Sequence, residues 1–475
     1  MRKLIGLLFF GIAFTTAYAQ KKWSLQDCVM YARQHNISVK QADIQARLDQ
    51  LSVDQNKLAN YPSFDFSTGT GIQFGRSIDP TSNQFTNNQV MFVNGGLNLG
   101  MDLFNWFRKK NTLAASKYTV QASIAMVEKI KDDIALNVAN GYLTALLSKE
   151  RISISKVQME QSKSQFLATE SKVKNGVLPE LNLLEMKTQL SKDSANYLDA
   201  IAGFDLSILQ LKAILNIDAA EPFDIETPPV ALIHVEPLEN LAPNDVYQSS
   251  LTLLPQQKIN KLLLEAAKKN VLVAKSSMYP SISFFGGAST MYSDAQKRVP
   301  SSFGYSVDSV GYANFNNQKI PVFVGNASVT GYDKNGFFTQ MNHNFSQNIG
   351  INLRVPIFNS GSAKTQWKRA KLNVENQELV NEQDAQKLKQ DIYQAHANAV
   401  AAKQKYLSNL ATVEIASETF EASKKRYDVG LLSSIDLITN QNNVYNAKIN
   451  LILSQYDYVF KMKLLEFYKG MGIKL

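Results

Sequence analysis

Residues 97–103 are Leu-Asn-Leu-Gly-Met-Asp-Leu, with an apolar residue at every second position. The same alternation returns over residues 349–357, where Gly350, Asn352 and Arg354 separate the apolar residues. Strands of about 10 residues with one apolar side and one small or polar side are typical of transmembrane β-barrels. A soluble β-sandwich with one solvated face has the same pattern, so alternation alone leaves both architectures open.

A further alternating segment precedes each of these strands. Residues 64–74 precede the first strand, and residues 282–288 precede the second with a less regular alternation. The chain is therefore expected to form two β-hairpins, over residues 62–104 and 280–358. Residues 291–348, rich in Ser, Asn, Gly and Tyr, are expected to form a long outer loop of the second hairpin.

The hairpins belong to two internal repeats. Tyr-Pro-Ser-Phe at residues 61–64 recurs 218 residues later as Tyr-Pro-Ser-Ile. Lys-Asn-Gly-Val-Leu at residues 174–178 recurs 254 residues later as Asp-Val-Gly-Leu-Leu. The increase in the offset places an insertion of 36 residues within the second hairpin.

Both repeats have the same order of elements: a helical stretch, the hairpin, a very long helix without Pro, a Gly turn and a returning helix. The long helices have 70 residues each, which corresponds to about 105 Å at 1.5 Å per residue, so they must pack lengthwise against partners. The first repeat is expected over residues 20–217, with helices 25–59, 106–175 and 180–215. The second is expected over residues 245–475, with helices 246–278, 360–429 and 434–468. A Pro-rich, irregular connector over residues 218–244 joins them.

Four strands per chain cannot close a barrel, because bacterial barrels start at about eight strands. An open edge in lipid leaves unpaired N–H and C=O groups, each costing several kcal/mol. Two copies would form eight strands around an interior filled by side chains, and three would form twelve strands around a water-filled channel. Polar residues on the inner face favour the trimer; the residues predicted to line this lumen are Asp65, Asn98, Asp102, Asn352 and Arg354. The expected fold class is thus mixed α and transmembrane β, with a trimeric twelve-stranded barrel.

The first residues indicate export. Residues 1–19 have a basic start, an apolar run and an Ala-Tyr-Ala end, which is the pattern of a cleaved signal peptide. Export excludes nucleic acid as the partner of a chain with a net charge of +9. One Cys and four His without ligand spacing indicate neither a disulfide nor a metal site. No catalytic constellation is present, so we expect no enzyme activity and no cofactor.

Trp106 follows the second strand and precedes the basic residues 108–110. Because Trp is enriched at membrane interfaces, Trp106 is predicted to lie at the periplasmic interface near lipid headgroups. A solvated helix start is the alternative interpretation.

The second Gly turn and the helix after it carry a family resemblance. Arg-Tyr-Asp-Val-Gly at residues 426–430, Ser-Ile-Asp-Leu at 434–437 and Val-Tyr-Asn-Ala at 444–447 resemble the TolC-like outer-membrane efflux proteins. The resemblance covers nearly the whole mature chain. It implies a homotrimer in the outer membrane whose β-barrel is continued by a long α-helical barrel through the periplasm. It also implies a passive duct of a tripartite efflux or type I secretion system.

The same resemblance implies partners, namely a periplasmic adaptor, an inner-membrane transporter of the RND or ABC type, and outer-membrane lipid. The exported substrate stays open between drugs, metal ions, peptides and proteins. An exported trimeric helical stalk with a β-head, acting in adhesion or scaffolding, remains the alternative.

The family's periplasmic gate has a Tyr and an Arg near the turn and two inward Asp residues one helical turn apart. Tyr427 matches the Tyr and Asp436 the first Asp, whereas Leu432 and Thr439 stand where the Arg and the second Asp are expected. The equivalent positions of the first repeat hold Asn182 and Glu185. Three-fold symmetry would turn Asp436 and Glu185 into carboxylate rings that favour cations, although both can equally be solvated surface acids. The resemblance also implies adaptor-docking turns, formed by Gly176, Val177, Leu178, Gly430, Leu431 and Leu432.

Overall fold

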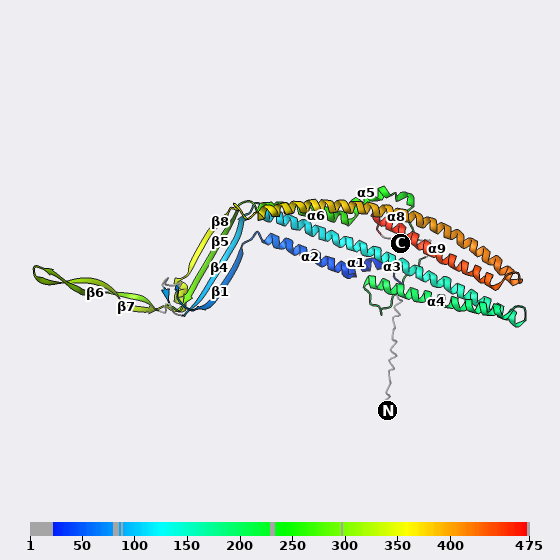
Figure 1. Ribbon diagram of the computed structural model, residues 1–475, viewed down its shortest axis with the longest axis horizontal. Helices are drawn as coiled ribbons and strands as arrows, with labels where there is room; N and C mark the ends of the chain where they lie inside the picture. The colour runs from blue at the N-terminus through cyan, green and yellow to red at the C-terminus, as the bar shows by residue number, and fades with distance from the viewer. Residues whose placement is uncertain (1–21, 79–84, 87–88, 229–232, 296–297, 473–475) are drawn as a thin grey trace, which may run out of the picture. The chain divides into compact units, whose positions relative to one another are not determined.

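The computed structural model describes residues 22–78, 85–86, 89–228, 233–295 and 298–472. The expected signal peptide, residues 1–19, lies outside them. The chain divides into two compact units (Figure 1). The helical unit comprises residues 1–51, 117–266 and 373–475, and the strand unit comprises residues 52–116 and 267–372.

The helices follow the internal repeat residue by residue. At an offset of 218 residues, α1 (Leu25–His35) and α2 (Ile37–Leu58) correspond to α5 (Pro243–Leu253) and α6 (Pro255–Ser276). At an offset of 254 residues, α3 (Arg108–Lys174) and α4 (Glu180–Leu215) correspond to α8 (Ser362–Asp428) and α9 (Ser434–Tyr468). This correspondence confirms the two internal repeats. In the connector, the structure describes the 3₁₀ turn η2 (Leu238–Asn240), and α5 begins at its end.

The first helical stretch of each repeat is interrupted, which differs from the single helix expected over residues 25–59 and 246–278. The break falls at Asn36 and at Leu254, both with extended backbone. Pro255 explains the second break, because proline disfavours helical geometry in the residue before it. At the first, the Asn36 side chain accepts a hydrogen bond from the N–H of Ser38 (2.8 Å) and donates to the carbonyl of Ile214 (2.9 Å).

The largest core of the helical unit joins α1, α3, α4, α9 and the connector. Tyr142 is buried at its centre, and its hydroxyl lies 3.1 Å from the carbonyl oxygen of Trp23 and 2.7 Å from that of Glu226. The connector is irregular but packed, since Ile225 and Leu241 are fully buried. Apolar burial and hydrogen bonds together therefore hold the connector against the helices.

The strand unit contains a four-stranded antiparallel sheet in the order β1-β4-β5-β8. Its strands are β1 (Ser63–Gln73), β4 (Val90–Phe104), β5 (Ser281–Ser293) and β8 (Ser346–Arg354). The β4–β5 pairing joins the two repeats side by side. Within the described residues, β1 and β8 each keep one edge without a hydrogen-bonding partner strand.

The outer segments differ from expectation in two places. The alternation over residues 349–357 predicts a strand to its end, but β8 stops at Arg354, because Pro356 has no N–H for a ladder hydrogen bond. The expected outer loop is largely structured. Within this loop lie an additional hairpin, formed by β6 (Arg298–Phe315) and β7 (Gln318–Lys334), and the short helix α7 (Phe337–His343). Between β1 and β4 of the first hairpin, the described residues form two short strands, β2 (Ser77–Ile78) and β3 (Phe85–Thr86).

The β6–β7 hairpin turns at Asn316 and Asn317, whose φ values of 48° and 62° suit a two-residue hairpin turn. It spans residues 298–334, nearly the length of the 36-residue insertion inferred from the repeat. Its strands pair with each other and not with the four-stranded sheet. The buried Gln340 fixes α7 next to β5, since its amide exchanges two hydrogen bonds of 2.9 Å with the backbone of Ser293.

Candidate functional site

The strand register brings the predicted lumen residues onto one face of the sheet. Asp65 lies directly opposite Asn98. Asp102 and Asn352 both lie opposite Ser283. Arg354 follows Asn352 by two residues and so lies on the same face. All five residues expected to line the lumen therefore share one surface.

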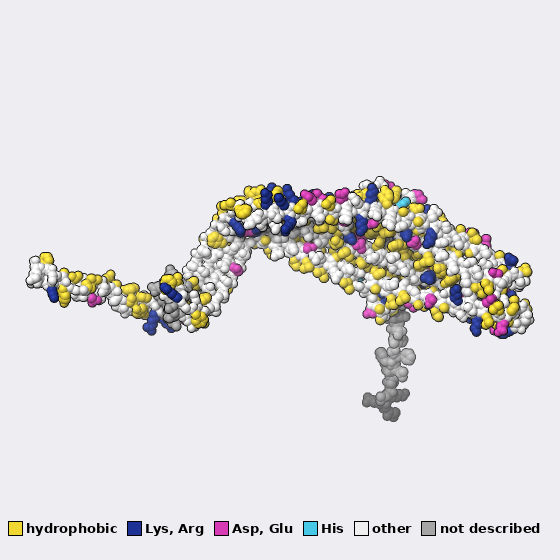
Figure 2. All heavy atoms as spheres, viewed as in Figure 1, with side chains coloured by type: hydrophobic (Ala, Val, Ile, Leu, Met, Phe, Trp, Pro, Cys, Tyr) yellow, Lys and Arg dark blue, Asp and Glu magenta, His cyan; other side chains and the backbone are white. Residues whose placement is uncertain are grey.

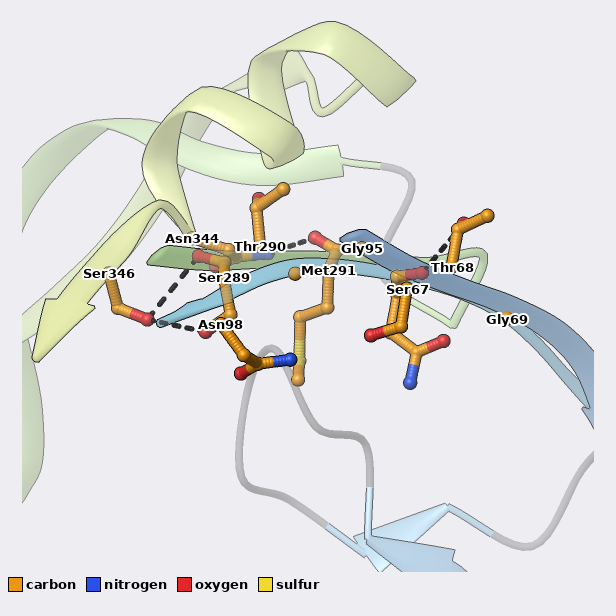
Figure 3. A pocket seen from close by; sticks show the side chains of 12 residues that line it. Ser67, Thr68, Gly69, Gly95, Asn98, Ser289, Thr290, Met291, Asn344 and Ser346 are labelled. Carbon is orange, nitrogen blue, oxygen red and sulfur yellow. Dashed lines mark hydrogen bonds between the residues drawn. The ribbon is translucent and has the colours of Figure 1, made fainter. Parts of the chain in front are cut away.

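A polar hollow of about 600 Å³ lies against the sheet and is lined by residues of β1, β4, β5 and β8. In Figure 3 the side chains of Asn98 and Met291 project from one side of the sheet, and those of Thr68 and Thr290 from the other. Asn344, which precedes β8, donates to the carbonyl of Met291 (2.8 Å). Small and uncharged side chains leave this surface open to water.

The opposite face of the sheet is largely apolar, and α7 packs against it at Tyr292, whose ring centre lies 5.1 Å from that of Phe337. Cross-strand pairs such as Phe64–Leu99 and Phe284–Ile351 run across it. Ile349 is 77% exposed and Ile351 is 68% exposed. Such a continuous exposed apolar surface requires a partner or lipid.

Asp102 has a neighbour that the sequence pattern did not indicate. Its carboxylate lies 3.7 Å from a guanidinium nitrogen of Arg108 and 3.6 Å from the ammonium of Lys109. The negative charge of Asp102, one of the two acids predicted to line the lumen, is therefore balanced by basic residues of its own chain. Trp106 lies in the turn between β4 and α3, where its ring contacts those of Phe104 and Tyr279.

The two Gly turns have the same geometry. Gly176 and Gly430 have φ values of 72° and 77°, and each ends its long helix with the paired hydrogen bonds of a Schellman motif. Val177 and Leu431 are 67% and 69% exposed. The next residues, Leu178 and Leu432, pack instead into a core with Tyr427 and Leu437. Each turn thus presents one apolar side chain outward and anchors the next.

The predicted gate residues fall into two groups. Asn182 and Glu185 on α4 meet at one hydroxyl of α9: Asn182 donates to Ser434 Oγ (3.2 Å), and Ser434 donates to the Glu185 carboxylate. Tyr427 is buried, with its hydroxyl 3.2 Å from that of Thr169 and the Lys172 ammonium 5.3 Å from the centre of its ring.

Asp436 and Thr439 are exposed on α9. Ser433 caps this helix, because its Oγ accepts from the N–H of Asp436 (3.1 Å), and the same hydroxyl donates to the Asp436 carboxylate (2.7 Å). Thr439 donates only to the carbonyl of Ile435 in its own helix. Asp436 therefore has a structural role besides any role in a gate.

Sequence reasoning missed a buried polar layer between α3, α4 and α9. Asp193 is 1% exposed and accepts hydrogen bonds from Ser162 (2.5 Å) and Gln189 (2.9 Å). Gln441 of α9 donates to Ser162 (2.7 Å). A signal existed: small polar residues recur every seven positions along α3, at Ser155, Ser162 and Thr169.

In the described part of the chain, no group of three or more His, Cys, Asp or Glu side chains could hold a metal ion. No helix among the described residues is both long and apolar enough to cross a membrane.

Comparison with known proteins adds to this geometry. The model of the family described as "Outer membrane efflux protein" matches residues 29–216 and 247–465. The chain is 21% identical over 348 residues to outer membrane protein TolC of Escherichia coli (strain K12), and 18% identical over 341 residues to the alkaline protease secretion protein AprF of Pseudomonas aeruginosa. These matches cover 72% and 71% of the chain but only 63% and 61% of the two relatives.

The fold is similar to that of CusC over 97% of this chain and 96% of CusC, with a TM-score of 0.74 and 15% identity. This similarity confirms the expected combination of a strand unit with long helices in two repeats. Together with the family match over both repeats, it shows that the chain belongs to the outer membrane efflux protein family.

Proposed function

We propose that this protein is the outer-membrane duct of a tripartite efflux or type I secretion system and exports its substrate passively. The observation that carries the proposal is the four-stranded sheet, which has one polar face, one exposed apolar face and, among the residues that the structure describes, two edges without a partner strand. In lipid, each unpaired backbone group costs several kcal/mol, so the edges must pair with those of other copies.

Three copies supply twelve strands, with the apolar faces toward lipid and the polar hollows toward a water-filled lumen. The long helices of the three copies enclose the periplasmic part of the duct. A periplasmic adaptor docks at the exposed apolar residues of the Gly turns, and an energised inner-membrane transporter delivers the substrate. The assignment as a channel for export is supported by two similar proteins: CusC, which forms a transmembrane channel, and AprF, an alkaline protease secretion protein.

The proposal contains no catalytic step and no cofactor. A stalk with a β-head acting in adhesion fits less well, because the family match extends across both repeats and such a head needs no lipid-facing band. The gate is proposed to lie where Asp436 and Glu185 of three copies approach one axis.

The test is the mass of the particle extracted in detergent from outer membranes, with bound detergent subtracted. A particle of three chains that conducts ions in a planar bilayer supports the duct. A particle with the mass of a single chain that does not conduct contradicts it.

A further inference from the structure

The turn between β4 and α3 carries two large aromatic residues where its backbone does not require them. Trp106 and Phe107 have φ values of 49° and 61°, a left-handed conformation that bulky residues rarely adopt. The second repeat makes the same turn with Ser360 and Gly361, at φ values of 53° and 74°. Since Ser-Gly suffices for the turn, the rings of Trp106 and Phe107 serve another purpose.

These rings extend the apolar face of the sheet. Phe104 is the strand partner of Ile282, which in turn pairs with Leu353 of the exposed apolar face. The ring centre of Phe104 lies 5.4 Å from that of Trp106, and the Trp106 ring lies edge-on to that of Tyr279 at 4.8 Å. An aromatic cluster therefore begins where the lipid-facing surface ends.

Ammonium groups lie next to the rings. Trp106, Phe107 and Tyr279 line a pocket of about 630 Å³ together with Lys110, Lys269 and Lys275. Lys110 Nζ lies 5.9 Å from the centre of the Phe107 ring. Within the described residues, none of these three lysines has a carboxylate within ion-pair distance, in contrast to Arg108 and Lys109.

The sequence around the pocket is uniformly basic. Residues 105–116, 267–279 and 359–372, the segments of α3, α6 and α8 nearest in sequence to the strands, contain ten Lys and Arg and no Asp or Glu. Figure 2 shows Lys and Arg side chains gathered where α8 begins. Asp102 balances Arg108 and Lys109, whereas no acid within these segments faces Lys110, Lys269 and Lys275, so an anion from outside the chain is the natural complement of these three lysines.

We propose that this pocket binds the headgroup of an anionic phospholipid, with the phosphate held by Lys110, Lys269 and Lys275. The inference rests on the proposed function, because it needs the sheet to be embedded in the outer membrane. Apolar strands, aromatic rings and ammonium groups follow one another in the order of acyl chains, glycerol region and phosphate. Ammonium groups form strong charge-assisted hydrogen bonds with phosphate oxygens.

The test is native mass spectrometry of the delipidated, detergent-solubilised full-length protein with added phosphatidylglycerol. We expect the protein to retain this lipid, and the triple variant K110Q/K269Q/K275Q to bind it roughly 10- to 100-fold more weakly. The matched control K319Q/K334Q removes lysines from the β6–β7 hairpin and should bind as the unaltered protein does. The variant W106S/F107G, which copies the turn of the second repeat, should fold normally and also lose affinity.

Equal binding by the triple variant and the control would overturn the proposal. So would equal retention of diacylglycerol, which has no phosphate, or complete displacement of the lipid by inorganic phosphate, which would make the pocket a simple anion site. Conductance of the same preparations separates the two ideas: a protein that binds the lipid but forms no channel contradicts the duct and not the pocket.

Discussion

Glu185 of α4 accepts a hydrogen bond from the hydroxyl of Ser434, the first residue of α9. These two residues are 249 positions apart, and Asn182 donates to the same hydroxyl. One hydroxyl thereby connects the returning helices of both repeats next to their Gly turns.

Replacing Ser434 with alanine should loosen this connection. The Glu185 carboxylate and the Asn182 amide would both lose a partner, which costs about 1–3 kcal/mol for a group left unsatisfied. We expect faster hydrogen exchange over residues 180–190 and a lower midpoint of thermal unfolding. Thr439→Ala is the control, because that hydroxyl bonds only within α9. Equal rates of hydrogen exchange over residues 180–190 in both variants would show that the Ser434 hydroxyl does not hold the helices together.

Two substitutions of Asp436 separate its charge from its hydrogen bond with Ser433. Asp436→Asn keeps an acceptor for Ser433 but removes the negative charge, whereas Asp436→Ala removes both. If a ring of Asp436 carboxylates lines the gate, both variants should show weaker block by Mg²⁺ in a planar bilayer. Only Asp436→Ala should also lose about 1 kcal/mol of stability, because the Ser433 hydroxyl loses its acceptor. Unchanged block in both variants rules out the ring.

Gly430→Ala should destabilise the protein because its φ of 77° is a left-handed conformation. An alanine in this conformation lowers the free energy of unfolding by about 1–2 kcal/mol. Gly203→Ala in the middle of α4 is the matched control, since a Cβ has open space at both positions. In α4 the substitution should stabilise, by up to about 1 kcal/mol. Circular dichroism at increasing temperature measures both, and shifts of the same sign would contradict the argument.

Cys28 should make the folded protein sensitive to alkali. Burial, and then the nearby Asp27 carboxylate, raises the pKa of its thiol to about 12. An unfolded thiol ionises near pH 8.5, so the stability that the neutral buried thiol contributes is complete below about pH 8.5 and is lost as the pH rises toward 12.

The variant Cys28→Ala should therefore lose stability less steeply over this range. The unaltered thiol should stay unreactive toward iodoacetamide at pH 8 until the protein unfolds. Rapid alkylation of the folded protein would show that the thiol is accessible.

The helices could be predicted from the sequence almost to the residue, because Pro and Gly mark where they can and cannot continue. The break at Asn36 could not, since it depends on a hydrogen bond to Ile214, 178 positions away. The β6–β7 hairpin could not be predicted either, because irregularities near Pro300 and Ser309 interrupt the alternation of apolar and polar residues along its first strand. That the five residues predicted to line the lumen share one face of the sheet followed from period-two alternation, whereas the partner of Glu185 depends on how α4 packs against α9.

The β6–β7 hairpin, which accounts for the insertion, forms a sheet of its own, separate from the four-stranded sheet. It takes all its backbone pairs from itself, so removing residues 298–334 would bring the second repeat close to the length of the first and leave the four-stranded ladder intact. Substitutions in this hairpin should therefore have little effect on the stability of the rest of the fold. We therefore expect this segment to diverge fastest among related bacteria, and its Asn316–Asn317 tip to be the place where an epitope can be inserted without disturbing the channel.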